Sequence, residues 1–124
     1  MEVTAHAKGV KVSTRKVRLV ADAIRNMAAR DAVAALSVTQ KHGAYPLLKV
    51  IKSAMANAVN NAKLSEANLV ISKLEVNEGQ FLKRFHASTR GRIKPYKKRT
   101  THITVVLKEL VEAKSVTEKK EAAK

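Results

Sequence analysis

The chain contains no cysteine and no tryptophan, and aromatic residues make up only 3% of its 124 residues. The absence of cysteine excludes disulfides, thiolate metal sites and a cysteine nucleophile. Histidine is scarce, and the spacing of the four histidines does not match that of metal ligands. They are His6, His42, His86 and His102. We therefore expect neither a bound metal nor a cofactor.

The chain also lacks a long apolar run. No stretch approaches the roughly 18 residues that a membrane-spanning helix needs, and no signal-peptide-like apolar segment follows Met1. We therefore expect a cytoplasmic protein with no membrane partner. The sequence shows no Ser/His/Asp arrangement, no paired carboxylates and no glycine-rich nucleotide loop. For these reasons we expect no catalytic residue and no small-molecule substrate.

Acidic residues are missing from one long stretch of a strongly basic chain. The formal net charge is +15, and no Asp or Glu occurs between Glu78 and Glu109. Residues 81–107 hold eight basic and no acidic side chains, and residues 1–30 hold seven basic against two acidic ones. The remaining segments, 31–80 and 108–124, carry a net charge of +1 each. A solvated surface usually mixes both signs, so this localised excess indicates a polyanionic partner, with nucleic acid as the first candidate.

Apolar residues at helical spacing predict three helices. The first begins at Ser13, a favourable N-cap, and ends at Asn26, which tolerates the left-handed cap conformation. Within it, Asp22 is expected to pair with Arg18 or Arg25. The second is a short helix N-capped by Asp31 and running through Val38. The third spans about residues 43–62 and has Pro46 in its first turn, where a missing N–H costs little.

Alternating apolar residues predict three strands. The first covers residues 3–8 and ends at Gly9, the second covers 69–76, and the third covers 103–107. In the second strand, we expect Val70, Leu74 and Val76 to share one face. We expect the second and third strands to pair in the antiparallel direction.

Between these last two strands lies a connection of 23 residues, 77–99. A structureless loop longer than about 12–15 residues is rare in a compact domain unless it is functional. The connection is therefore either a basic loop or a continuation of both strands into a long hairpin with its tip near Ser88–Gly91. Such a hairpin would project about 30 Å, at ~3.3 Å per residue, and would need an external scaffold because it cannot bury its own faces.

The side chains of this connection and of the first helix suit RNA. Lysine and arginine neutralise phosphates, arginine adds bidentate contacts, and aromatic rings stack on unpaired bases. The candidate RNA-binding residues are Lys8, Lys11, Arg15, Lys16, Arg18, Arg25, Lys83, Arg84, Phe85, His86, Arg90, Gly91, Arg92, Lys94, Tyr96, Lys97, Lys98, Arg99 and His102. Two alternatives stay open: Phe81, Phe85 and Tyr96 pair across the hairpin instead, and His102 is a structural residue.

Several motifs in order resemble those of the large-subunit ribosomal protein number 22 family of bacterial type. They cover about residues 3–109 and are Ser13-Thr-Arg-Lys-Val-Arg-Leu-Val-Ala-Asp22, Lys52-Ser-Ala-Met-Ala-Asn-Ala58, Val76-Asn-Glu-Gly79, Lys83-Arg84, Arg90-Gly-Arg92 and Lys98-Arg-Thr-Thr-His-Ile-Thr-Val-Val106. The sequence departs from the family pattern at Ala87-Ser88-Thr89, where Pro-Arg-Ala is common, and at Asn26, where Gly is usual.

The resemblance implies an α+β fold with three helices packed on a small three-stranded antiparallel sheet and a long protruding β-hairpin. We expect one domain over residues 1–110, including an extended hairpin over 77–101, and a mixed-charge tail over 111–124. That tail lies outside the family pattern, and its composition predicts either disorder or a marginal polar helix.

The resemblance also implies a function. Members of the family are non-catalytic constituents of the large ribosomal subunit; they bind its 23S-type rRNA and aid its assembly. Their hairpin lines the nascent-peptide exit tunnel, and its tip corresponds here to Ala87, Ser88, Thr89, Arg90, Gly91 and Arg92. The implied partners are rRNA, neighbouring large-subunit proteins and the nascent peptide, with macrolides binding nearby. The alternative is a free architectural protein whose basic arm wraps a nucleic-acid groove.

Overall fold

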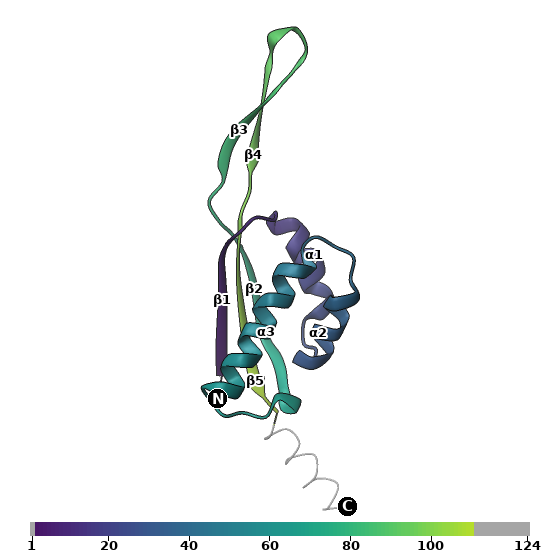
Figure 1. The fold of residues 1–124 in the computed structure, drawn as a ribbon, viewed down its shortest axis with the longest axis vertical. Helices are drawn as coiled ribbons and strands as arrows, with labels where there is room; N and C mark the ends of the chain where they lie inside the picture. The colour runs from purple at the N-terminus through teal and green to yellow at the C-terminus, as the bar shows by residue number, and fades with distance from the viewer. Residues whose placement is uncertain (1, 111–124) are drawn as a thin grey trace, which may run out of the picture.

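The computed structural model describes residues 2–110, so the predicted tail lies outside the described residues. Three strands form an antiparallel sheet in the order β1-β5-β2, and two more form a separate hairpin that projects from the body (Figure 1). The strands are β1 (Glu2–Val10), β2 (Leu69–Glu78), β3 (Leu82–Ala87), β4 (Ile93–Lys98) and β5 (Thr101–Glu109). The predicted antiparallel pairing of the second and third body strands is confirmed by the β2–β5 register, for example Leu74 opposite Val105.

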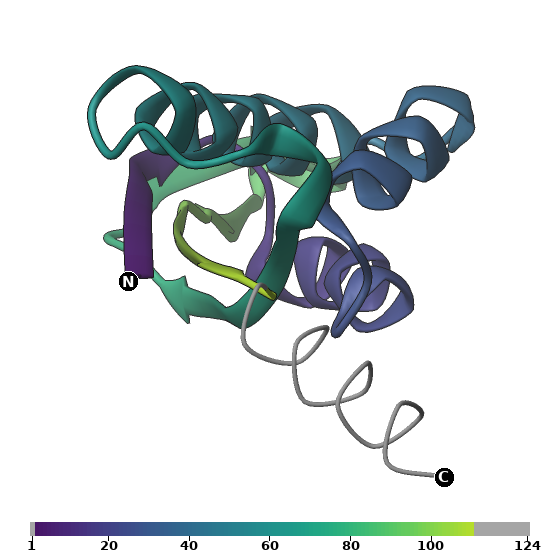
Figure 2. The same cartoon turned by 90° about the horizontal axis from the view of Figure 1, so that it is seen from below.

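Three helices accompany the sheet. They are α1 (Thr14–Ile24), α2 (Ala29–Val38) and α3 (Ala44–Asn60), with short 3-10 turns at Glu66–Asn68 and Thr89–Gly91. Seen from below, α3 lies over the sheet, and α1 and α2 lie beyond its β2 edge (Figure 2). The fold is therefore the α+β arrangement of three helices on a three-stranded sheet that the sequence resemblance implied. Among the described residues, no helix is long and apolar enough to cross a membrane.

The core lies between α3 and the sheet. On the sheet side, the core is formed in part by alternating buried residues of β5. Ile103, Val105 and Leu107 are at most 1% exposed, whereas the residues between them are half-buried on the opposite face. On α3, Leu47 and Ile51 are completely buried. Three alanines of the same helix, Ala44, Ala54 and Ala58, are also buried, and their small side chains allow the helix to approach its neighbour closely.

Two bulges change what alternation alone predicted. The first strand does not end at Gly9, because β1 continues to Val10 and its register shifts between Ala7 and Val10. Gly9 has φ +70° in this bulge, a conformation that glycine adopts at little cost.

In β2 the expected buried face was wrong at Val70, which is half-buried. The register shifts between Ile71 and Lys73, so Leu69 and Ile71 face the core on one side of the shift and Leu74 and Val76 on the other. An inserted residue moves later side chains to the opposite face, which is why strict alternation from Leu74 back to Val70 failed.

The helix ends are partly as predicted. Ser13 occupies the N-cap position of α1, although its side chain makes no capping hydrogen bond, and Asn26 has φ +63° as expected. The prediction that Asp31 caps the second helix was wrong: α2 begins at Ala29, and Asp31 lies in its first turn. The reason is tertiary, because the segment before α2 is attached to the edge of β2 by the Ile71 N–H, which donates to the Met27 carbonyl at 3.1 Å.

Candidate nucleic-acid interface

The arm, residues 77–101, is anchored to the body by a buried threonine. Thr101 is completely buried at the start of β5, and its hydroxyl donates to the Val12 carbonyl at 2.5 Å. The Thr101 hydroxyl also lies 3.2 Å from that of Thr14, the first residue of α1. These contacts join β5 to the β1–α1 connection at the point where the arm leaves the body, so they set the direction in which the arm projects.

A glycine allows the two arm strands to meet closely at this neck. The Gly79 N–H donates to the Thr100 carbonyl at 2.9 Å. A β-carbon at position 79 would lie 2.5 Å from the Thr100 hydroxyl and 3.1 Å from a ring carbon of His102. Any side chain there would have to displace the Thr100 hydroxyl and the His102 ring, so glycine leaves room for these two side chains at the neck.

Beyond the neck, the connection forms a hairpin rather than a loop. β3 and β4 pair over six residues each, from Leu82 opposite Lys98 to Ala87 opposite Ile93. Every residue of both strands is exposed. The arm therefore has no core of its own, and both of its faces are available to a partner.

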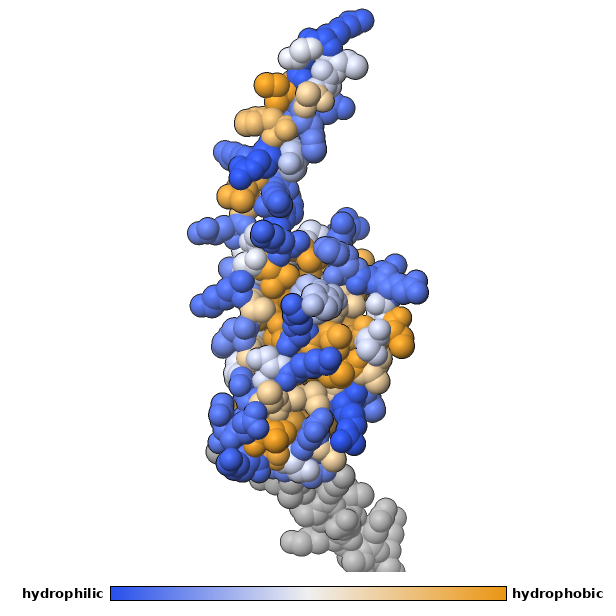
Figure 3. All heavy atoms as spheres, viewed as in Figure 1, coloured by the Kyte–Doolittle hydropathy of each residue, from blue (hydrophilic) through white to orange (hydrophobic). Residues whose placement is uncertain are grey.

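The strand register gives the arm two chemically different faces, because paired residues of an antiparallel ladder lie on the same face. One face carries mainly polar, cationic and aromatic side chains: Leu82, Arg84, His86, Lys94, Tyr96 and Lys98. The other is more apolar toward the tip: Lys83, Phe85, Ala87, Ile93, Pro95 and Lys97. In the space-filling view, hydrophilic side chains coat most of the arm and apolar ones lie between them (Figure 3).

The sequence left open whether the aromatic residues of the arm contact each other across the hairpin or contact RNA. The structure gives a different answer at each position. Tyr96 stacks on His86 within the hairpin, with ring centroids 4.0 Å apart and an interplanar angle of 15°. Phe81 lies under the Lys97 ammonium, which is 4.6 Å from the ring centroid. Phe85 is 68% exposed opposite Pro95. Phe81 and Tyr96 therefore stabilise the arm itself, and Phe85 is the ring most open to an unpaired base.

The tip is a tight turn that displays two arginines. The Ser88 N–H donates to the Arg92 carbonyl at 2.8 Å, and the Arg92 N–H donates to the Thr89 carbonyl at 3.3 Å. Arg90 and Gly91 both have positive φ, +58° and +70°, so Gly91 is a turn residue, as expected from its place in the predicted hairpin tip. Among residues 2–110 none covers this end of the arm, and Arg90 and Arg92 are exposed.

Two of the cationic residues predicted on the first helix are engaged with the body. The Arg18 guanidinium donates to the Val76 carbonyl from Nε and Nη2, at 3.2 and 3.0 Å. Arg25 donates to the Leu74 carbonyl at 3.0 Å and forms the expected ion pair with Asp22, also at 3.0 Å. Sequence reasoning missed that these side chains cover the free edge of β2, since the strand and the helix are about 50 residues apart.

The other body cations lie toward the end from which the arm projects. Lys8, Lys11, Arg15 and Lys16 are exposed on the last part of β1, its connection to α1 and the first turn of α1 (Figure 1). His102 has a structural contact, because its Nδ1 accepts the Gly9 N–H at 3.1 Å. The structure thus brings the two basic segments of the sequence to the same end of the molecule, one on the arm and one around its base.

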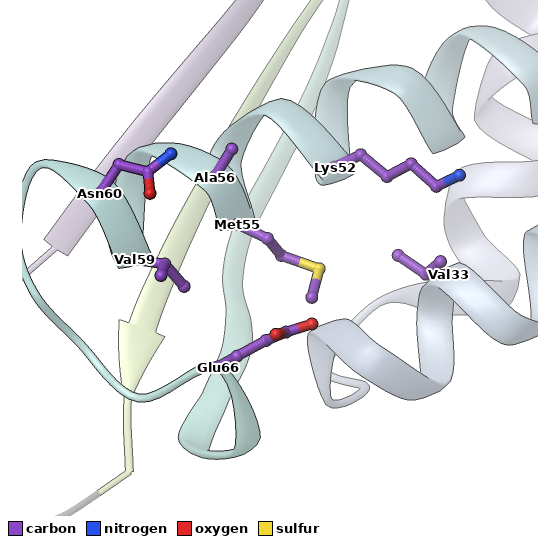
Figure 4. Close-up of a pocket in the computed structure, with 7 residues that line it drawn as sticks. All are labelled: Val33, Lys52, Met55, Ala56, Val59, Asn60 and Glu66. Carbon is purple, nitrogen blue, oxygen red and sulfur yellow. The ribbon is translucent and has the colours of Figure 1, made fainter.

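The body carries a groove among its helices. The groove in Figure 4, of about 340 Å³, lies between α3, α2 and the turn at Glu66–Asn68. Its lining is mainly apolar, with one basic side chain, Lys52, and one acidic side chain, Glu66. Across residues 2–110, no three His, Asp or Glu side chains gather as metal ligands would.

Comparison with known proteins agrees with this geometry. Residues 5–108 match the family model described as ribosomal protein L22p/L17e. A curated relative from Pediococcus pentosaceus, the large ribosomal subunit protein uL22, is 49% identical over 105 residues. The aligned region covers 85% of this chain and 89% of that relative.

Proposed function

Because the chain belongs to the ribosomal protein L22p/L17e family, we propose that it is a structural constituent of the large ribosomal subunit in the cytoplasm. In this role it binds 23S-type rRNA, contacts neighbouring ribosomal proteins and aids assembly of the subunit. The arm and the basic residues around its base are the RNA-binding surfaces. No catalytic step is part of this function.

The observation that carries the proposal is an exposed arm that has cations but no acids beyond Glu78. Every residue of β3 and β4 is exposed, and the eight basic side chains between residues 81 and 107 all lie on the arm. In isolation such an arm is poorly stabilised, because its like charges repel one another and its faces bury little apolar area. Folded RNA supplies both the counter-charge and the walls that the arm lacks.

Within the subunit, we assign the tip to the wall of the nascent-peptide exit tunnel. This assignment is supported by the family membership and by the position of the tip residues, Ala87 to Arg92, at the far end of the arm. A passing nascent peptide then meets the tip side chains, and macrolides bind nearby. The tip contains Ser88 and Thr89, so its outer surface is small and polar beside the two arginines.

The test removes charge from the arm and leaves the body unchanged. We expect the variant with Lys83, Arg84, Arg90 and Arg92 replaced by Ala to bind large-subunit rRNA more weakly. The slope of log K against log salt should become shallower by about 3, since each lost phosphate contact contributes about 0.7–0.9. Circular dichroism should show an unchanged body. The control replaces four exposed cations of the body, Arg30, Lys63, Lys73 and Lys108, so the total charge falls equally.

Two outcomes would contradict the proposal. One is an arm variant that binds rRNA no more weakly than the control variant. The other is a wild-type protein that sediments in the soluble pool or with the small subunit on a sucrose gradient. Crosslinks to chromosomal DNA in place of rRNA would identify the free architectural protein instead.

A further inference from the structure

The two edges of the three-stranded sheet differ in how they are covered. Along β2, the Met27 carbonyl accepts the Ile71 N–H, and Arg18 and Arg25 donate to carbonyls of the strand. The opposite edge is β1 (Figure 1), and within residues 2–110 no strand pairs with its outer side. An uncovered edge presents unpaired backbone N–H and C=O groups, which are a template for another strand.

The hydrogen bonds of β5 show which backbone groups of β1 are unpaired. Successive residues of a strand in an antiparallel sheet turn their N–H and C=O groups alternately to one side and the other. At the two ends of β5, the Leu110 N–H donates to the Asn68 carbonyl, and the Thr100 carbonyl accepts the Gly79 N–H. Even-numbered residues of β5 therefore bond to β2, and odd-numbered ones bond to β1.

The outward groups of β1 belong to its even-numbered residues. The residues opposite the odd-numbered positions of β5 are Val3, Ala5 and Ala7. Between them, Thr4 and His6 turn their N–H and C=O groups outward, and no group in the described part of the chain bonds to these. Consecutive outward residues stand about 6.8 Å apart, twice the ~3.4 Å rise of an antiparallel strand. The edge thus offers donors and acceptors at the repeat that another strand matches.

A groove of about 380 Å³ lies beside the first half of this edge. It is formed by β1 and the C-terminal end of α3, and its lining comprises Glu2, Val3, Thr4, Asn57, Asn61 and Ala62. The side-chain amides of Asn57 and Asn61 make no hydrogen bond to any residue of the described range. An amide both donates and accepts, so these two suit the backbone of an incoming strand.

We propose that the β1 edge, residues 2–8, is a docking site for an extended segment of another large-subunit protein, which adds a fourth strand to the sheet. This inference rests on the proposed function, because the partner belongs to the same subunit. Main-chain hydrogen bonds to Thr4 and His6 hold the segment, and alternate side chains of the segment enter the groove. Charge complementarity orients it: exposed Glu2 favours a basic residue, and exposed Lys8 favours an acidic one.

Hydrogen-bond chemistry favours a polypeptide over RNA on this edge. Phosphate oxygens accept hydrogen bonds but do not donate them, so they leave the outward carbonyls unpaired. Residues 2–7 contain no Lys or Arg, in contrast to the arm. A second copy of this chain is a poor occupant, because each copy carries a net charge of +15 and the two repel each other.

The first experiment measures amide hydrogen exchange of β1 in the free protein and in assembled large subunits. We expect the Thr4 and His6 amides to exchange at least about tenfold more slowly in the subunit, because they become hydrogen-bonded there. The Ala5 and Ala7 amides, which bond to β5, should be protected in both states and serve as the internal control. Thr4 and His6 amides that exchange equally fast in both states would overturn the proposal.

The second experiment identifies the occupant by photo-crosslinking from the groove. A photo-crosslinking amino acid replaces Asn61 in the full-length protein, and large subunits assembled with it are irradiated. An adduct to an extended segment of another ribosomal protein, mapped by mass spectrometry, supports the proposal. An adduct to rRNA alone, an adduct to a second copy of this chain, or no adduct overturns it.

Thr4→Pro tests the edge itself, because it removes the outward N–H and keeps the ladder with β5. We expect the crosslinking yield to fall about tenfold, since one hydrogen bond is lost and the ring blocks the edge. Thr4→Val is the matched control, which keeps the N–H and should crosslink with unchanged yield. Equal yields in the two variants would contradict strand addition. The exchange measurement needs no variant, so it decides the question even when Thr4→Pro fails to fold.

Failure of this inference is distinguishable from failure of the proposed function. A protein that sediments with the large subunit while its Thr4 and His6 amides stay unprotected refutes only the docking site on β1. A protein that is absent from the large subunit refutes the proposed function.

Discussion

Thr101→Val is the sharpest test of how the arm is anchored, because the two side chains have nearly the same shape and differ in the hydroxyl. Thr101 is completely buried and donates to the Val12 carbonyl at 2.5 Å. The substitution removes this hydrogen bond and leaves a carbonyl oxygen and the Thr14 hydroxyl with one partner fewer. A buried polar group without its partner costs about 1–3 kcal/mol.

We therefore expect Thr101→Val to lower the free energy of unfolding by about 2 kcal/mol. For a domain of this size, a loss of about 2 kcal/mol lowers Tm by about 9 °C. Thr101→Ser keeps the hydroxyl and loses a methyl group, so it should cost only about 1 kcal/mol. Urea titration measures each free energy of unfolding. Unfolding is followed by circular dichroism at 222 nm, because the chain has no tryptophan for fluorescence.

The matched control is Thr104→Val in the same strand. Thr104 is half-buried on the open face of the sheet, where its hydroxyl lies 3.1 Å from Nδ1 of His6. We expect this change to cost less than about 0.5 kcal/mol, the usual range for surface substitutions. If Thr101→Val destabilises the protein no more than Thr104→Val does, the buried hydroxyl does not anchor the arm and the reasoning is refuted.

Three further predictions concern other contacts. Gly43→Ala should lower the free energy of unfolding by about 1–3 kcal/mol through overpacking, because the nearest atoms are backbone and φ is an ordinary −71°; an unchanged urea midpoint would contradict the close approach. Arg18→Met should cost about 1–2 kcal/mol by removing both hydrogen bonds to Val76, as urea titration will show. In RNA-free protein, amides of residues 84–96 should exchange with deuterium faster than those of β5, and strong protection of the arm would refute this.

Local patterns were sufficient for most of the elements. Period-two alternation located β5, whose buried residues Ile103, Val105 and Leu107 follow it without interruption. The helical spacing of Val17, Val20, Ala21 and Ile24 located α1, and all four are buried. These patterns succeed because a regular element repeats its geometry along the chain, so its buried face can be recognised from spacing alone.

Prediction failed where a distant segment decided the local outcome. Asp31 has good capping chemistry, but the attachment of Met27 to β2 starts the helix at Ala29. Val70 fits an alternation that the shift between Ile71 and Lys73 breaks. In each case the deciding contact joins residues that are far apart in sequence, or depends on one extra residue in a ladder, and no local periodicity records it.

Some features of the candidate interface likewise follow from the sequence, and others depend on the tertiary structure. The sequence alone showed that an acid-free run of cations occupies a connection too long for an ordinary loop, because charge and length are properties of the chain. Only the tertiary structure showed that Arg18 and Arg25 contact the edge of β2, and that the basic residues of late β1 and early α1 lie at the end from which the arm projects. The net charge of a segment can be counted from the sequence. A binding surface, however, requires the charged side chains to lie close together in space, and the contacts between helices and sheet determine whether they do.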